Sequence, residues 1–197
     1  MRSPVADLLA DAAAAFDDAG VDWYLFGAQA AILHGVARLT ADVDITVRLA
    51  GTTSSAALAT RLANRQFQLR LSDPDFIART SVMPFVHLPT SLPLDVVLSG
   101  PGLEDRFFER SETREVEGVR VPVATAEDLI VMKILAGRPK DLEDVVAILA
   151  TRGSEMDAAY VRETLQLLEG ALAQNDLTPS FEGALERSKR TGRGPRP

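Results

Sequence analysis

The spacing of apolar residues changes once along this chain, at Thr125, and that change constrains the fold more than any other feature. Before it, short apolar runs typical of strands alternate with helical segments. After it, apolar residues recur only at helical spacing. The sequence therefore predicts an α+β or α/β-like N-terminal part over residues 1–124 and a helical part over residues 125–188. Residues 189–197 are predicted to form a disordered basic tail.

The expected order of elements in the N-terminal part is α-β-α-β-α-β-β-β-β. The first helix carries apolar residues from Val5 to Phe16 and ends before Gly20, a residue type typical of the position after a helix. After it, strands are expected over 21–26, 43–49, 66–71, 83–88 and 92–98, and helices over 28–33 and 53–63. A hairpin is expected over 113–123. In the C-terminal part, one helix follows Thr125, the next has Pro139 in its first turn, and two more cover 157–173 and 179–187.

Composition excludes several classes of protein. The longest windows without a charged residue, 23–37 and 80–94, fall short of the roughly 18 residues that a membrane span needs. The chain has no cysteine, which excludes disulfides, a thiolate zinc site and a cysteine nucleophile. Because Asp7 and Asp11 interrupt the region where a secretory signal would be apolar, a cytoplasmic location is expected. P-loop and dinucleotide-binding glycine motifs are absent from the sequence.

Acidic residues occur where strands are otherwise apolar. Asp42 and Asp44 are two apart at the start of a predicted strand, a spacing that directs both carboxylates to one face of a sheet. Asp95 stands alone in a later apolar strand. Like charges this close need compensation, which a hard divalent cation such as Mg²⁺ or Mn²⁺ provides. The alternative for each acid is a solvated position at a turn or sheet edge, and that reading is preferred for Asp73 and Asp75.

A glycine corner precedes the acids. Gly27 follows the first strand and Ala28 opens a short apolar helix, so backbone amides there could approach a phosphate. Three acids beneath a phosphate-holding corner describe a metal-dependent phosphoryl or nucleotidyl transfer site.

These segments resemble the nucleotidyltransferase superfamily with the polymerase-beta-like fold. The resemblance lies in three segments: residues 26–28, the arrangement Arg38-x-Thr40-x-Asp42-x-Asp44, and Asp95 between Leu94 and Val96. The stretches 124–133 and 138–144 are similar to the AbiEii-type branch, which supplies toxins of type IV toxin–antitoxin systems. Ala28 departs from the pattern, because the superfamily usually has Ser or Gly there. The resemblance implies a mixed sheet with flanking helices, followed by a helical part that completes the cleft.

The resemblance also implies roles for individual residues. Asp42 and Asp44 would bind the metal, and Asp95 would be a third ligand or the general base. The triphosphate would be held by Gly27, Ala28, Arg38, Thr40 and Lys133, with Asp141 orienting Lys133.

The sequence around Lys133 can also be interpreted without the family resemblance. It is the single charged residue in a helical stretch that is apolar nearly all round, so the helix is expected to be buried and its ammonium to need an anionic partner. That partner would be a substrate phosphate or Asp141. The competing reading is a lysine whose flexible stem carries the charge to solvent.

The predicted function is metal-dependent transfer of a nucleoside monophosphate from an NTP to an acceptor. The AbiEii resemblance implies RNA, above all transfer RNA, as acceptor, and a cognate antitoxin protein as partner. Two alternatives stay open: an enzyme that modifies a small molecule such as an antibiotic, and a non-catalytic protein that binds a nucleotide or a partner. The net charge of −7 opposes broad RNA binding, but residues 186–197 carry +4.

Overall fold

The computed structural model describes residues 2–49, 51, 53–71 and 73–191. The chain divides into two compact units: a sheet unit of residues 1–29 and 39–124, and a helical unit of residues 30–38 and 125–197. Segment 30–38 therefore belongs to the helical unit, although the sequence placed it with the sheet. No helix among the described residues is long and apolar enough to span a membrane.

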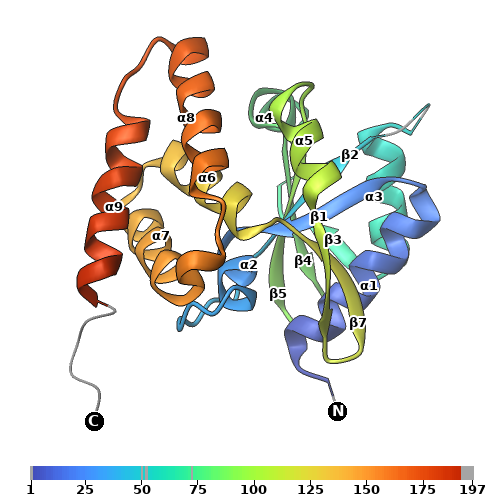
Figure 1. Cartoon of the computed structure of the whole chain (residues 1–197). Coiled ribbons are helices and arrows are strands. Elements are labelled where there is room, and N and C mark those ends of the chain that lie inside the picture. The colour runs from blue at the N-terminus through green and yellow to red at the C-terminus, as the bar shows by residue number, and fades with distance from the viewer. Residues whose placement is uncertain (1, 50, 52, 72, 192–197) are drawn as a thin grey trace. The chain divides into compact units, whose positions relative to one another are not determined.

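The sheet unit contains a seven-stranded mixed sheet with the strand order β3-β4-β5-β2-β1-β7-β6 (Figure 1). The strands are β1 (Asp22–Phe26), β2 (Val43–Arg48), β3 (Phe67–Leu69), β4 (Val82–His87), β5 (Leu92–Leu98), β6 (Glu112–Val116) and β7 (Val119–Val123). Strands β2 and β5 are parallel, as are β1 and β7, and the remaining neighbours are antiparallel. The predicted mixed sheet with flanking helices is confirmed.

Five helices begin in the sheet unit. They are α1 (Pro4–Ala19), α2 (Gly27–Leu33), α3 (Ser55–Asn64), α4 (Pro74–Thr80) and α5 (Leu103–Arg110). The sequence predicted the first three. It missed α4, a helix of seven residues capped by Asp73, and α5, which is mostly charged and buries only Phe107 and Phe108. In both helices the apolar stripe is too short to show helical periodicity.

The two faces of the sheet differ in what covers them. One face presents Val43, Ile45 and Val47 of β2, all buried, and packs against α1 and α3. His87 of β4 also lies on this side and is fully buried, where its Nε2 is 3.0 Å from the Asp11 carboxylate of α1. On the opposite face, Phe108 of α5 packs edge-on against Tyr24. This second face also presents Asp44 and Asp95.

Among the described residues, the helical unit contains segment 30–38 and four later helices (yellow-orange to red in Figure 1). They are α6 (Ala126–Ala136), α7 (Pro139–Arg152), α8 (Ala158–Leu172) and α9 (Leu177–Thr191), with a short 3-10 turn, η1 (Gly153–Glu155). The Thr125 hydroxyl caps α6 by accepting from the Asp128 amide, and Pro139 opens α7 as expected. Helix α9 continues through Thr191, so residues 189–191 are helical rather than part of a tail, and residues 192–197 lie outside the described residues.

Candidate active site

Two of the predicted metal ligands are direct neighbours on the sheet. In the parallel pairing of β2 with β5, Asp44 stands opposite Asp95. Partners in such a register point to the same face, so both carboxylates project from the face opposite the buried Val43 and Ile45. Asp44 is partly buried, and 40% of the Asp95 side chain is exposed. The pairing brings together two acids that are 51 positions apart in the sequence.

Gly27 lies directly against Asp44. Phe26, the last residue of β1, pairs with Asp44, and the chain then turns at Gly27 with a positive φ of 68°. A Cβ at this position would lie 2.0 Å from the Asp44 Oδ2 and 2.9 Å from the Asp44 Cβ, so the Asp44 side chain would have to move. Glycine is therefore favoured both by the backbone conformation and by the carboxylate beside it. Ala28 follows in the first turn of the seven-residue helix α2.

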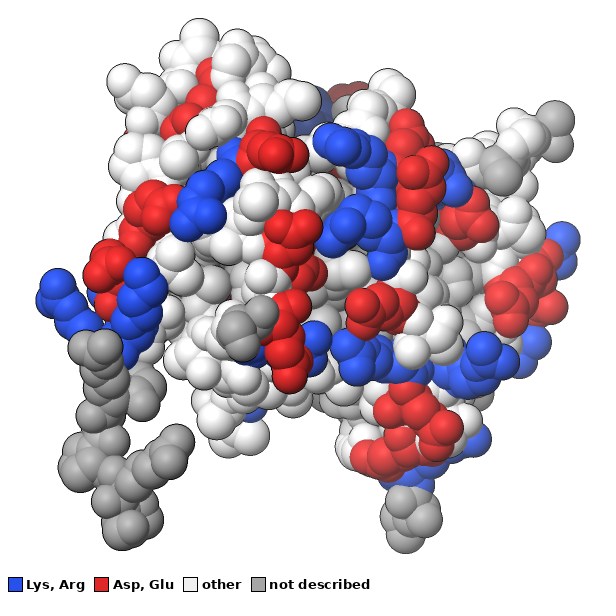
Figure 2. Space-filling model, viewed as in Figure 1, with Lys and Arg blue, Asp and Glu red and all other residues white. Residues whose placement is uncertain are grey.

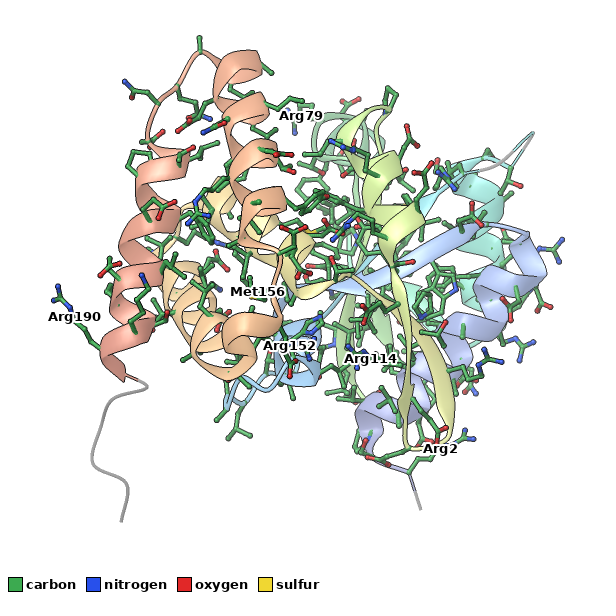
Figure 3. The ribbon with its side chains drawn as sticks, viewed as in Figure 1. Arg2, Arg79, Arg114, Arg152, Met156 and Arg190 are labelled. Atoms are coloured by element: carbon green, nitrogen blue, oxygen red, sulfur yellow. The ribbon has the colours of Figure 1, made fainter. Side chains whose placement is uncertain are left out.

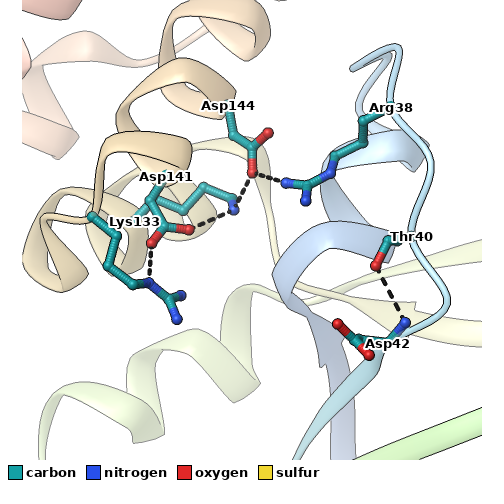
Figure 4. Close-up of polar contacts among 7 residues, drawn as sticks. Arg38, Thr40, Asp42, Lys133, Asp141 and Asp144 are labelled. Atoms are coloured by element: carbon teal, nitrogen blue, oxygen red, sulfur yellow. Dashed lines mark hydrogen bonds and ion pairs between the residues drawn. The ribbon is translucent and has the colours of Figure 1, made fainter.

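Asp42 and Thr40 lie in the segment that leads into β2. The Thr40 hydroxyl accepts a hydrogen bond from the Asp42 amide at 3.2 Å (Figure 4). The Thr40 carbonyl accepts from the buried Gln29 side chain, also at 3.2 Å. Thr40 thus fixes the backbone before β2 rather than presenting its hydroxyl as an isolated group. Asp42 itself is exposed.

The predicted set of three carboxylates does not form a ready metal cage. Among the described residues, no three acidic or histidine side chains are placed together closely enough to hold one ion. Asp95 instead forms an ion pair with Arg70, which follows β3. The donor chemistry still fits a hard cation, since Asp44 and Asp95 offer carboxylate oxygens on one face of the sheet.

Arg70 was missed by the sequence analysis. The available signal was the alternation along residues 67–70, in which the polar Gln68 and Arg70 are exposed while Phe67 is buried and Leu69 half-buried. That alternation shows that Arg70 shares a face with Gln68, but pairing with Asp95 depends on β3, β4 and β5 being consecutive in the sheet.

A second cluster of charges lies in the helical unit. The Lys133 ammonium is 2.6 Å from the Asp144 Oδ2 and 3.3 Å from the Asp141 Oδ1 (Figure 4). Arg38 NH1 donates to the same Asp144 oxygen at 2.6 Å, and Arg138 Nε donates to Asp141. Lys133, Asp141 and Asp144 each expose less than a tenth of their side chains. We refer to these five residues as the ion network.

The ion network decides between the sequence readings of Lys133. The reading in which its charge reaches solvent is wrong, because the side chain is 6% exposed and its ammonium contacts two carboxylates. The expected pairing with Asp141 is present, and Asp144 adds a closer partner that the sequence did not single out. Asp141 and Asp144 are three apart on α7, so both face the same neighbour. Arg38 is likewise engaged by a carboxylate.

Ionisation of Asp141 is governed by opposing effects. Burial raises the cost of the charged form, but the hydrogen bond from Arg138 and the nearby charge of Lys133 outweigh it and hold the pKa of Asp141 below its usual value. Asp141 is therefore a carboxylate at neutral pH, as the pairing with Lys133 requires.

Comparison with known families identifies the class of protein. Residues 6–165 match the family described as "Nucleotidyltransferase of unknown function (DUF6036)". The chain belongs to this family. No curated protein matches the sequence of this nucleotidyltransferase.

Solved structures share the fold of this nucleotidyltransferase at low sequence identity. The solution structure of the antibiotic-resistance factor ANT(2'')-Ia has a TM-score of 0.60 at 15% identity, over 88% of this chain and 97% of that one. ANT(2'')-Ia in complex with adenylyl-2''-tobramycin gives 0.57 at 15% identity, over 82% and 97% of the two chains. An antigenic nucleotidyltransferase-like protein from Paracoccidioides brasiliensis gives 0.56 at 16% identity, over 95% and 94%.

Proposed function

We propose that this nucleotidyltransferase moves a nucleoside monophosphate from an NTP to an acceptor hydroxyl with the help of Mg²⁺ or Mn²⁺. The observation that carries the proposal is the pairing of Asp44 with Asp95 on one sheet face, with the Gly27 backbone directly against the Asp44 carboxylate. The family match supports the reaction class. A divalent cation, when bound, would neutralise the triphosphate and favour in-line attack.

Within the sheet unit, we assign different residues to binding the metal and to binding phosphate. Asp44 and Asp95 are the proposed central ligands because they are register partners, and Asp42, whose backbone amide donates to the Thr40 hydroxyl, is the proposed third ligand. In the reaction the acceptor oxygen bonds to the α-phosphorus, the bond to the bridging oxygen breaks, and pyrophosphate leaves. The acceptor proton passes to solvent. Gly27 and Ala28 remain our proposed phosphate contacts.

Two of the proposed triphosphate contacts, Lys133 and Arg38, belong to the helical unit. Lys133 and Arg38 are already paired with carboxylates, so their charge is largely balanced before any substrate arrives. A role for Lys133 in binding phosphate stays a prediction, and NTP affinity of a Lys133 variant tests it. Asp141 would hold the ammonium in the orientation that such binding needs.

The acceptor we propose is RNA, with transfer RNA first among the candidates. A small-molecule acceptor needs a mostly apolar pocket beside Asp95. One apolar cavity among the described residues of the sheet unit, about 570 Å³, is lined in part by Met83 and Leu98. Both are opposite in register to the acids: Met83 precedes Pro84, the partner of Asp95, and Leu98 pairs with the buried Val47. This cavity therefore opens from the wrong face of the sheet to receive an acceptor.

Charge on the surface favours a local rather than a broad contact with RNA. Acidic and basic side chains are interspersed over the described residues on the face shown in Figure 2. Arg190, at the end of α9, extends away from the helix (Figure 3), and Arg187 and Lys189 are exposed nearby on the same helix. Arg38, Lys133 and Arg138 are held by buried carboxylates. The pair of Lys189 with Glu186, at 2.7 Å, is exposed and therefore weak. We therefore propose the basic end of α9 as the RNA contact.

The test is transfer of label from each of the four α-labelled NTPs, with Mg²⁺, into total RNA and into a panel of small hydroxylated antibiotics. We expect label in RNA, none with Asp44→Asn, and no loss of melting temperature in that variant, since it removes one of two repelling acids. Labelling of an antibiotic but not of RNA would establish the second candidate, which the likeness to ANT(2'')-Ia brings forward. No transfer to either, with NTP binding retained, would establish a non-catalytic protein.

The proposed place of this chain among the AbiEii-type toxins has a separate test. Induced expression should arrest growth, Asp44→Asn should abolish the arrest, and a cognate antitoxin protein should relieve it. Normal growth with active enzyme in the same cells would contradict the toxin role and leave nucleotidyl transfer standing.

A further inference from the structure

Arg70 is anchored on one strand and reaches an acid on the next. Its backbone amide donates to the Pro84 carbonyl at 2.8 Å, and its side-chain Nε donates to the Phe85 carbonyl at 3.0 Å. Its terminal NH2 then contacts the Asp95 Oδ1. The guanidinium therefore crosses β4 in a fixed orientation and ends on the face that carries Asp44 and Asp95.

The two carboxylates on the sheet face of Asp44 and Asp95 are stabilised by a nearby positive charge. Neighbouring strands lie about 4.8 Å apart, so two ionised carboxylates at paired positions repel. Arg70 supplies a positive charge to one of them. The pair is accessible to water, with 43% of the Arg70 side chain and 40% of the Asp95 side chain exposed. Exposed ion pairs of this kind are weak and open readily, so a divalent cation can replace the guanidinium.

We propose that Arg70 is a built-in counter-ion of the metal-binding face: it holds Asp95 while the metal is absent and competes with the metal for that carboxylate. The inference rests on the proposed function, because it takes Asp95 to be a metal ligand. Arg70 is thus a positioning residue, which acts through Asp95.

Removing the guanidinium should strengthen metal binding for two reasons that act in the same direction. The Asp95 carboxylate no longer has to be released, and a positive charge near the divalent cation is gone. For a cation at a solvated surface, loss of one such charge corresponds to about tenfold in affinity. In metal-free buffer the same change should lower the melting temperature, since the repulsion between Asp44 and Asp95 is then unbalanced.

The experiment is Mn²⁺ binding to the full chain, followed by the electron paramagnetic resonance signal of free Mn²⁺, with and without a non-hydrolysable ATP analogue. Arg70→Gln should bind Mn²⁺ about tenfold more tightly than the unaltered chain. Arg70→Lys should fall between them, because it keeps the charge but loses the anchor on Phe85. The matched control is Arg65→Gln, which removes an exposed Arg–Asp pair of the same unit, with Asp18 at 3.0 Å. We expect it to leave Mn²⁺ affinity unchanged.

The outcomes separate this inference from the proposed function. Equal or weaker Mn²⁺ binding by Arg70→Gln, with the unaltered chain binding normally, overturns the competition and leaves the metal site intact. If neither protein binds Mn²⁺, the metal site and the competition are both wrong. Tight binding by Arg70→Gln alone supports the competition even if the unaltered chain binds too weakly to measure.

Discussion

Replacement of Lys133 by methionine tests the ion network most directly. The change removes an ammonium that contacts Asp144 at 2.6 Å and Asp141 at 3.3 Å in a site where all three side chains are buried. Hydrogen bonds to charged groups contribute roughly 1.5–3 kcal/mol each. Each carboxylate keeps one guanidinium, from Arg38 or Arg138, so the loss stays below that of a fully orphaned buried charge. We expect a loss of about 3 kcal/mol in the free energy of unfolding.

The assay is thermal and urea unfolding of the metal-free chain. For a chain of this size, about 3 kcal/mol corresponds to a fall of roughly 6–12 °C in melting temperature. Lys140→Met is the matched control, because Lys140 is exposed in the first turn of α7, and it should shift the melting temperature by less than about 2 °C. A Lys133→Met variant as stable as the unaltered chain would refute the network as a source of stability. If such a variant also bound NTP weakly, the phosphate role of Lys133 would be established instead.

Three further predictions concern other residues. Gly27→Ala should abolish transfer and lower stability by about 1–3 kcal/mol, measured by urea unfolding, because the added Cβ meets the Asp44 carboxylate at a positive φ; normal activity would show that the corner can shift. Because the folded pKa of Asp141 is lowered, its contribution is complete above the unfolded value of about 3.9 and is lost as the pH falls through the folded value. The unfolding free energy should thus fall more steeply below about pH 4 in the unaltered chain than in Asp141→Asn, and parallel curves would contradict this. Truncation after Thr191 keeps all of α9 and removes Arg193 and Arg196, so RNA affinity should fall and the slope of its logarithm against that of salt concentration should decrease by about 1–2, as measured by filter binding; an unchanged slope would exclude a contact by these arginines.

The sequence determined the elements whose signals are local. Periodicity located α1 and α6, the positive φ at Gly20 matches its expected place after a helix, and β6 and β7 form the hairpin predicted over 113–123. Alternation also placed the Asp44 side chain opposite the apolar residues of its own strand. These features depend on residues within a few positions of one another, so one sequence suffices to find them.

The tertiary structure decided which distant residues meet. Pairing of Asp44 with Asp95 follows from β2 and β5 being parallel neighbours, and the reach of Arg70 to Asp95 follows from the order β3-β4-β5. The sequence left a phosphate, Asp141 or solvent as possible partners of the Lys133 ammonium. The packing of α6 against α7 excludes solvent and places Asp141 and Asp144 in contact with it. Strand order, register and helix packing are set by the burial of the whole apolar surface at once, and no local pattern encodes them.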